Sequence, residues 1–170
     1  YPSLHNNIIR NNVFHDFGGG DARSSAILIY NGRGNQIYNN LIYNGSSGIA
    51  SGTNGSQTEI YNNTVYNNAG TGVSSAGPNA IVKNNISYRN GLNLDISGST
   101  GSVASHNFEK DPLFVDAANG DFSLQANSPA RNAGEDLSAF GVTTDLAGAP
   151  RNDGVFDMGA LEFRGSEQFD

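Results

Sequence analysis

Apolar and polar residues follow a repeating order along residues 1–107, in which a short apolar run is followed by two asparagines and a second apolar run. The copies read IRNNVFH at 9–15, IYNNLIY at 37–43, IYNNTVY at 60–66 and VKNNISY at 82–88, with a degraded ASHNF at 104–108. Their second asparagines are 28, 23, 22 and 22 residues apart. This period, without helical 3.6-residue periodicity, predicts a right-handed parallel β-helix of about five coils, with three short strands per coil.

The positions of the repeat differ in their expected roles. The residue that opens each copy is mostly β-branched and should point into the core, at Ile9, Ile37, Ile60, Val82 and Ala104. Stacked side-chain amides both donate and accept hydrogen bonds, and asparagine tolerates a left-handed bend. We therefore expect one asparagine per coil to serve as both ladder and bend, at Asn12, Asn40, Asn63, Asn85 and Asn107. Of the two positions after the pair, one should face inward, and the pattern does not say which.

A compositional break lies near residues 107/108, so we expect coils over 1–107 and a C-terminal capping tail over 108–170. The coils carry five basic and four acidic residues, whereas the tail carries four basic and twelve acidic ones and no Asn-Asn unit. A cap must cover the unpaired backbone groups of the last coil. An arginine can tie such a cap together through carboxylates and carbonyls. The residues expected in this structural role are Asp145, Arg151, Asp157 and Glu162.

Composition excludes several classes of protein. The chain has no cysteine, so it has no disulfide and no thiolate metal site. No apolar run approaches the length of a membrane span. A net charge of −7 argues against nucleic acid as a partner. Because residues 1–8 read as the end of a coil, we expect earlier coils or a stacking subunit to cover the first coil.

Two rows beside the asparagine pairs are candidate ligand-binding surfaces. The row before the pair, called the first row, contains Arg10, Tyr38, Tyr61, Lys83 and Ser105. The row three residues after the pair, called the second row, contains His15, Tyr43, Tyr66, Tyr88 and Lys110. Outward-facing aromatic and cationic side chains would suit a glycan groove. Tyrosine also packs well on a β surface, which leaves a structural interpretation open.

Catalytic and metal sites are less well indicated. A polysaccharide lyase needs a base and a cation that neutralises the uronate. The candidate bases are Lys83, Tyr61, Tyr66 and His15, the candidate cations are Arg10 and Arg89, and no spacing singles out a pair. A glycosidase needs two opposed carboxyl groups, and the acidic residues of the coils do not stack in register. Asp16 and Asp21 flank three glycines and are candidate calcium ligands, or turn-forming residues of a solvated loop.

The tail carries motifs that resemble a known family. DPLF at 111–114, GDFSL at 120–124, SPA at 128–130, GAPR at 148–151 and DMGALE at 157–162 follow the Asn-Asn coils. Together they resemble the C-terminal part of secreted bacterial right-handed β-helix proteins, the pectate-lyase-like superfamily. One departure is Asn132, where the family often has aspartate.

The resemblance implies a secreted or cell-surface bacterial protein and leaves three functions open. The superfamily contains lyases, glycoside hydrolases, epimerases and adhesins, so the first function is polysaccharide binding or processing. The second is a structural subunit that assembles into fibres by stacking coil on coil. The third is an adhesin stabilised by calcium.

Overall fold

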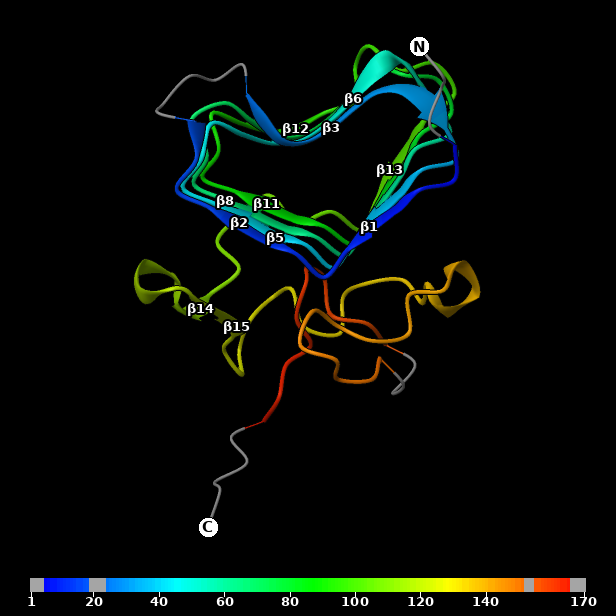
Figure 1. Ribbon diagram of the computed structural model, residues 1–170. Helices are drawn as coiled ribbons and strands as arrows, with labels where there is room; N and C mark the ends of the chain where they lie inside the picture. Colours follow the sequence, from blue (N-terminus) through cyan, green and yellow to red (C-terminus); the bar gives the residue numbers. More distant parts are fainter. Residues whose placement is uncertain (1–4, 19–23, 152–154, 166–170) are drawn as a thin grey trace.

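The computed structural model describes residues 5–18, 24–151 and 155–165, and these form a β-solenoid with a tail along its flank (Figure 1). Three parallel sheets make up the coils. The first sheet contains β1 (Ile8–Arg10), β4 (Gln36–Tyr38), β7 (Glu59–Tyr61), β10 (Ile81–Lys83) and β13 (Val103–Ser105). The second contains β2 (Val13–His15), β5 (Leu41–Tyr43), β8 (Thr64–Tyr66) and β11 (Ile86–Tyr88). The third contains β3 (Ser25–Arg33), β6 (Ser47–Ser56), β9 (Thr71–Ser75) and β12 (Leu92–Asp95).

The parallel β-helix predicted from the repeat is confirmed, with about four turns in place of about five. Equivalent residues pair in register from coil to coil, as where Ile37 pairs with Ile60 and Ile60 with Val82. The fifth coil is represented by β13 in the first sheet and by an isolated parallel bridge of Phe108 with Ile86 of the second sheet. In the described parts of the chain, no helix is long and apolar enough to cross a membrane.

The core lies inside the coils and is thin: each strand of the first two sheets contributes one inward side chain, whereas β3 of the third sheet contributes two isoleucines. Ile37, Ile60 and Val82 are fully buried, as the row that opens each repeat predicts. From the second sheet, Ile42 and Val65 join them. The inward position after the asparagine pair is therefore the second one, because strand side chains alternate between faces.

The two asparagines of each pair divide the roles that the sequence assigned to a single residue. The first asparagine takes the left-handed backbone of the bend, with φ of 52° at Asn39 and 46° at Asn62. The second asparagine forms the ladder: the Asn40 side chain donates to Oδ1 of Asn63, and the Asn63 side chain donates to Oδ1 of Asn85, at 3.0 and 2.9 Å. The ladder is confirmed, whereas the assignment of the bend to the same residue is wrong.

A second asparagine ladder, not predicted, follows the bend between the second and third sheets. The Asn68 side chain donates to Oδ1 of Asn90 at 2.9 Å, and the backbone N–H of Gly45 donates to Oδ1 of Asn68 at 2.9 Å. The left-handed residues before this ladder are Asp16, Asn44, Asn67 and Arg89. The later coils therefore turn through side-chain amides at two of their bends.

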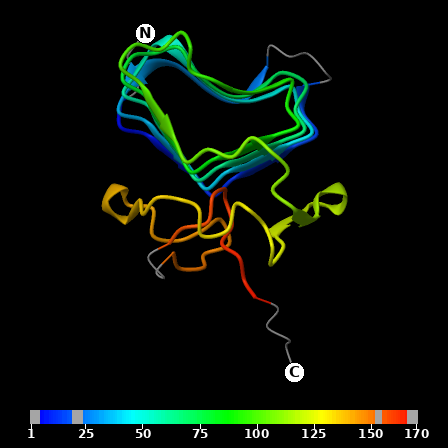
Figure 2. The ribbon, with the colours of Figure 1, turned by 180° about the vertical axis from the view of Figure 1, so that it is seen from behind.

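The tail lies along the flank of the solenoid, over the bend between the first and second sheets, and not over the last coil (Figures 1 and 2). It contains an antiparallel hairpin of β14 (Phe114–Asp116) and β15 (Asp121–Leu124), with the 3₁₀ turns η2 (Ala117–Asn119) and η3 (Ser138–Phe140). The bend asparagines bind it: side-chain amides of Asn39, Asn62 and Asn84 donate to backbone carbonyls of Thr144, Asp157 and Glu135. The tail therefore covers the flank of the coils, where the bend asparagines supply hydrogen-bond donors for it.

Candidate functional site

Most of the first row is not available to a ligand. Tyr38 and Tyr61 are 5% and 0% exposed, because Leu137, Val142 and Phe156 of the tail pack over them. The expectation that these two tyrosines form an open ligand surface is wrong. Both side chains lie on the outer face of the coil, but the tail covers that face.

The two cations of the first row are engaged with neighbouring side chains. Arg10 donates to the hydroxyl of Tyr38 at 3.3 Å, and its guanidinium lies 5.8 Å from the ring centroid. The Lys83 ammonium donates to a carboxylate oxygen of Glu135 at 2.8 Å, and its side chain is mostly buried. This ion pair occupies the ammonium with the tail, so the geometry gives no support to the candidate role of general base.

The second row packs beneath the hairpin of the tail and forms an aromatic cluster. Tyr66 contacts Tyr88, Phe114 and Phe122, with ring centroids 6.2, 5.7 and 5.5 Å apart. Tyr43 contacts Phe122 at 4.7 Å. These tyrosines are half-buried and keep part of their surface in contact with solvent. The hairpin therefore extends the aromatic surface of the solenoid and leaves it partly open.

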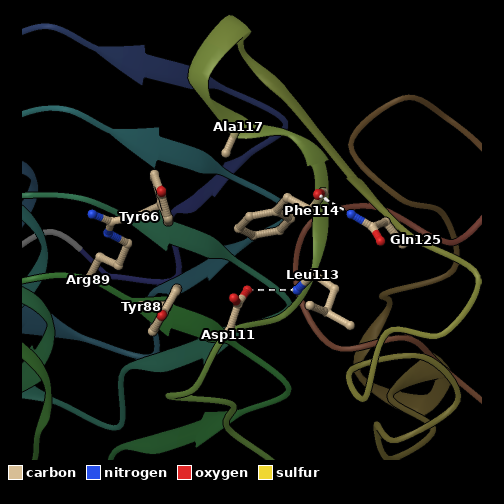
Figure 3. Close-up of a pocket in the computed structure, with 8 residues that line it drawn as sticks. All are labelled: Tyr66, Tyr88, Arg89, Asp111, Leu113, Phe114, Ala117 and Gln125. Atoms are coloured by element: carbon tan, nitrogen blue, oxygen red, sulfur yellow. Dashed lines mark hydrogen bonds between the residues drawn. The ribbon is translucent and has the colours of Figure 1, made fainter.

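A cavity of about 220 Å³ opens between the second row and the hairpin (Figure 3). Its lining residues are Tyr66, Tyr88, Arg89, Asp111, Leu113, Phe114, Ala117 and Gln125. The ring of Phe114 points toward the two tyrosines across the cavity (Figure 3). Aromatic walls with a few polar groups are typical of sites for small organic ligands.

The polar groups of this cavity come from one bend and from the start of the tail. Arg89 is exposed and has a left-handed backbone, with φ of 59°. Asp111 accepts a hydrogen bond from the backbone N–H of Leu113 at 3.0 Å, which orients its carboxylate. Leu113 itself has φ of 55°, a conformation that costs a leucine about 1 to 2 kcal/mol. Strained backbone of this kind concentrates at functional sites.

Sequence reasoning identified three of the lining residues and missed the others. Tyr66, Tyr88 and Arg89 were candidates because they belong to the repeat or adjoin it. The tail supplies Asp111, Phe114 and Gln125. The repeat of the coils does not indicate where the tail packs, so these residues could not be placed beside the tyrosines from the sequence. The concentration of phenylalanine in the tail was the one feature that pointed to further aromatic contacts.

His15 and Asp16 form a pair at the other end of the second row. Nδ1 of His15 lies 2.8 Å from a carboxylate oxygen of Asp16, and the imidazole stacks on Tyr43 with centroids 5.2 Å apart. The hydrogen bond from His15 lowers the pKa of Asp16 below its ordinary value. Asp21, the other candidate calcium ligand, lies outside the described residues. No group of three or more acidic or histidine side chains within the described ranges is placed to hold a metal ion.

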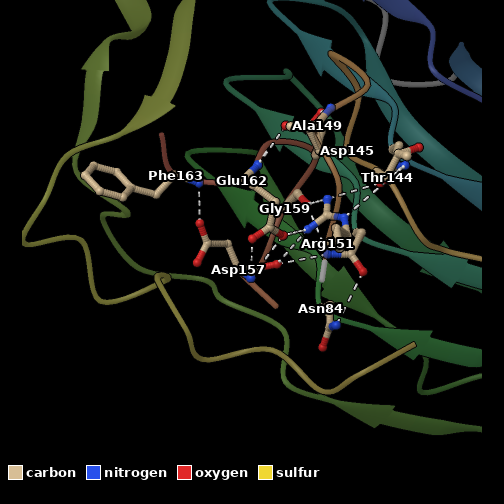
Figure 4. Close-up of polar contacts among 12 residues, drawn as sticks. Asn84, Thr144, Asp145, Ala149, Arg151, Asp157, Gly159, Glu162 and Phe163 are labelled. Carbon is tan, nitrogen blue, oxygen red and sulfur yellow. Dashed lines mark hydrogen bonds and ion pairs between the residues drawn. The ribbon is translucent and has the colours of Figure 1, made fainter. Parts of the chain in front are cut away.

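The residues expected to be structural meet around Arg151 (Figure 4). The guanidinium pairs with the carboxylate of Glu162 and donates to backbone carbonyls of Asp157 and Gly159 and to Oδ1 of Asn39. Burial lowers the pKa of Arg151, and the nearby carboxylates oppose that effect. Asp145 accepts hydrogen bonds from three backbone N–H groups of the tail. Arg151 thus joins two tail segments to one bend of the solenoid.

Asn132 also adjoins this cluster. It stands where the family that the tail motifs resemble often has aspartate. It has φ of 50°, and its backbone N–H donates to the carboxylate of Asp157 at 2.7 Å. Asparagine and aspartate both tolerate the left-handed conformation. The departure therefore leaves the backbone geometry of the tail intact.

Comparison with protein families matches residues 3–126 to the model described as right handed beta helix region. Comparisons with curated proteins and with solved structures gave no significant match. The matched range covers all three sheets and the hairpin beside the cavity. The chain belongs to the right-handed β-helix family.

Proposed function

We propose that this protein binds polysaccharide, outside the cell or at its surface, through the cavity between the second row and the hairpin. The observation that carries the proposal is the juxtaposition of Tyr66, Tyr88 and Phe114 around one open space, with charged groups at its rim. Sugar rings present apolar C–H faces and polar edges. Aromatic walls with convergent polar groups complement both features.

The charged groups suit hydroxyl recognition. The guanidinium of Arg89 supplies fixed donors, and the carboxylate of Asp111 supplies acceptors, so together they can bind the donor and acceptor sides of sugar hydroxyls. Their charges offset each other within the cavity. Gln125 stiffens the opposite wall, because its side-chain amide donates to the backbone carbonyl of Phe114 at 2.9 Å.

Binding is favoured over hydrolysis or elimination by the chemistry of the cavity lining. A glycosidase uses two opposed carboxyl groups, and Asp111 is the one carboxylate among the described lining residues. Lys83, a candidate base for elimination, lies in the first sheet and is paired with Glu135. We therefore propose recognition of a carbohydrate without its cleavage.

The test is binding to an array of neutral and acidic polysaccharides, followed by calorimetry on the ligand found. Tyr88→Ala should weaken binding about tenfold, equivalent to about 1.4 kcal/mol for the loss of one aromatic wall. Arg89→Asn, which keeps a residue suited to the left-handed backbone, should also weaken binding. Tyr30→Ala is the matched control, because Tyr30 is a 72% exposed tyrosine of the third sheet and does not line the cavity.

Two results would contradict the proposal. One is the absence of binding to every polysaccharide by the folded wild-type protein. The other is an equal loss of affinity in Tyr88→Ala and Tyr30→Ala. Incubation with pectate, alginate and chondroitin tests elimination directly. Ultraviolet-absorbing unsaturated products would show that the protein is a lyase and would contradict binding without cleavage.

A further inference from the structure

We propose that a second cavity, on the other side of the same bend, binds further sugar residues of the same polymer and selects a neutral polysaccharide. The proposal rests on the proposed function. This second cavity has a volume of about 370 Å³. Its lining residues are Phe17, Asn44, Gly45, Asn67, Asn68 and Ala69.

The two cavities adjoin across one bend of the chain. Tyr66 lines the first cavity and Asn67, the next residue, lines the second, so their Cα atoms are about 3.8 Å apart. Asn67 has φ of 53°, which turns the backbone between the second and third sheets. Its backbone N–H donates to the carbonyl of Tyr88 at 3.1 Å, which joins it to the neighbouring coil. A polymer longer than the first cavity therefore meets the second one by crossing this bend.

The second cavity offers an aromatic ring beside exposed amides. Phe17 lies directly against Gly45, where a Cβ atom would come within 2.1 Å of its ring. The side chain of Asn67 donates to Oδ1 of Asn44 at 2.8 Å, and both side chains are exposed. Among the described residues, this contact leaves Oδ1 and the second N–H of the Asn67 side-chain amide available to a ligand. A ring beside a free amide donor and acceptor suits a sugar with hydroxyl groups.

The electrostatics of the bend favour a neutral sugar at this position. None of the side chains that line the second cavity is charged. Asn44 also makes a side-chain hydrogen bond with the carboxylate of Asp16. Asp16 is the left-handed residue at the same bend in the first coil. That carboxylate is ionised at neutral pH, because its hydrogen bonds favour the charged form. A uronate placed here would meet a negative charge without a lining cation to offset it.

The experiment measures affinity for oligosaccharides of increasing length from the neutral polysaccharide found by the array. Asn67→Asp keeps the left-handed backbone and replaces the amide with a carboxylate. It should weaken the longest oligomers about tenfold and leave disaccharide binding unchanged. Phe17→Ala should give the same dependence on length, with folding checked by a melting curve because Phe17 packs against the core. Asn79→Asp is the matched control, since Asn79 is an exposed left-handed asparagine at another bend.

The outcomes separate this proposal from the first. If Tyr88→Ala weakens all lengths while Asn67→Asp and Phe17→Ala weaken none, the second site is refuted and the first stands. A preference of the wild-type protein for uronate polymers over neutral ones would refute the selection of neutral sugars. If the wild-type protein binds no polysaccharide at all, the proposed function itself fails.

Discussion

Replacing Arg151 with methionine should release the tail from the flank of the solenoid. The Arg151 side chain is 0% exposed, and its partner Glu162 is 9% exposed. Methionine fills a similar volume but leaves the carboxylate of Glu162 buried without its cation. Breaking a buried, hydrogen-bonded ion pair costs about 3 to 5 kcal/mol. For a domain of this size, that cost corresponds to a fall in melting temperature of about 6 to 20 °C.

Hydrogen exchange distinguishes release of the tail from unfolding of the coils. The backbone N–H of Gly159 donates to the carbonyl of Asn84 at 2.7 Å, and that of Ala160 donates to Oγ1 of Thr64 at 2.9 Å. Both amides should lose protection in Arg151→Met. The amide of Ile86, which donates to the carbonyl of Asn63 within the solenoid, should keep its protection until the coils unfold.

The control for this experiment is Arg164→Met. Arg164 lies 3.6 Å from the carboxylate of Asp145, but its side chain is 56% exposed. An exposed ion pair contributes about 0 to 1 kcal/mol, so the control should melt close to the wild type. If Arg151→Met costs no more than the control, the reasoning from burial is refuted.

Two further predictions concern the coils. Asn63→Ala removes a buried amide that donates to the carbonyl of Ile37 and to Oδ1 of Asn85. It should lower the free energy of unfolding, measured in urea, by at least about 3 kcal/mol. Asn12→Ala, at a half-buried rung of the same ladder, should lower it by less. Tyr61→Phe should raise the free energy of unfolding by about 1 kcal/mol at neutral pH, because the buried hydroxyl makes no well-formed hydrogen bond among the described residues. The nearby Glu59 carboxylate adds to the effect of burial on the pKa of this hydroxyl. Burial raises the pKa of Tyr61 above its ordinary value of 10, so the folded protein keeps that proton when the unfolded chain loses it. Wild-type stability should therefore fall above about pH 10 by at most about 1.4 kcal/mol per pH unit from this residue, and Tyr61→Phe should show a smaller fall in urea titrations between pH 8 and 11.5.

The solenoid could be predicted from the sequence because stacking places equivalent residues in equivalent surroundings. Ile37, Ile60 and Val82 pair directly and share one environment, so the constraint on one coil is repeated in the next. The asparagine ladder follows from the same repetition. The second ladder at Asn68 and Asn90 was missed because Phe17 and Gly45 occupy the equivalent positions in the first two coils.

Exposure of the outer rows could not be predicted in the same way, because it depends on a segment that does not repeat. Val13, Leu41 and Thr64 occupy the same position in successive coils, yet Val13 is 51% exposed and the other two are 7% and 2% exposed. Thr64 accepts a hydrogen bond from the tail through Oγ1. The tail covers the later coils and leaves the outer face of the first coil open, and no periodic signal carries that difference.

The candidate site arises from a difference between the two parts of the tail. Over the first sheet, Leu137 and Val142 fill the space above the tyrosines and bury Tyr61 completely. Over the second sheet, the hairpin packs Phe114 against Tyr66, but the short side chain of Ala117 leaves the space beside them unfilled, so a cavity stays open. Two similar tyrosine rows thus acquire different roles: one supports the fold beneath the tail, and the other borders a cavity that a ligand can enter.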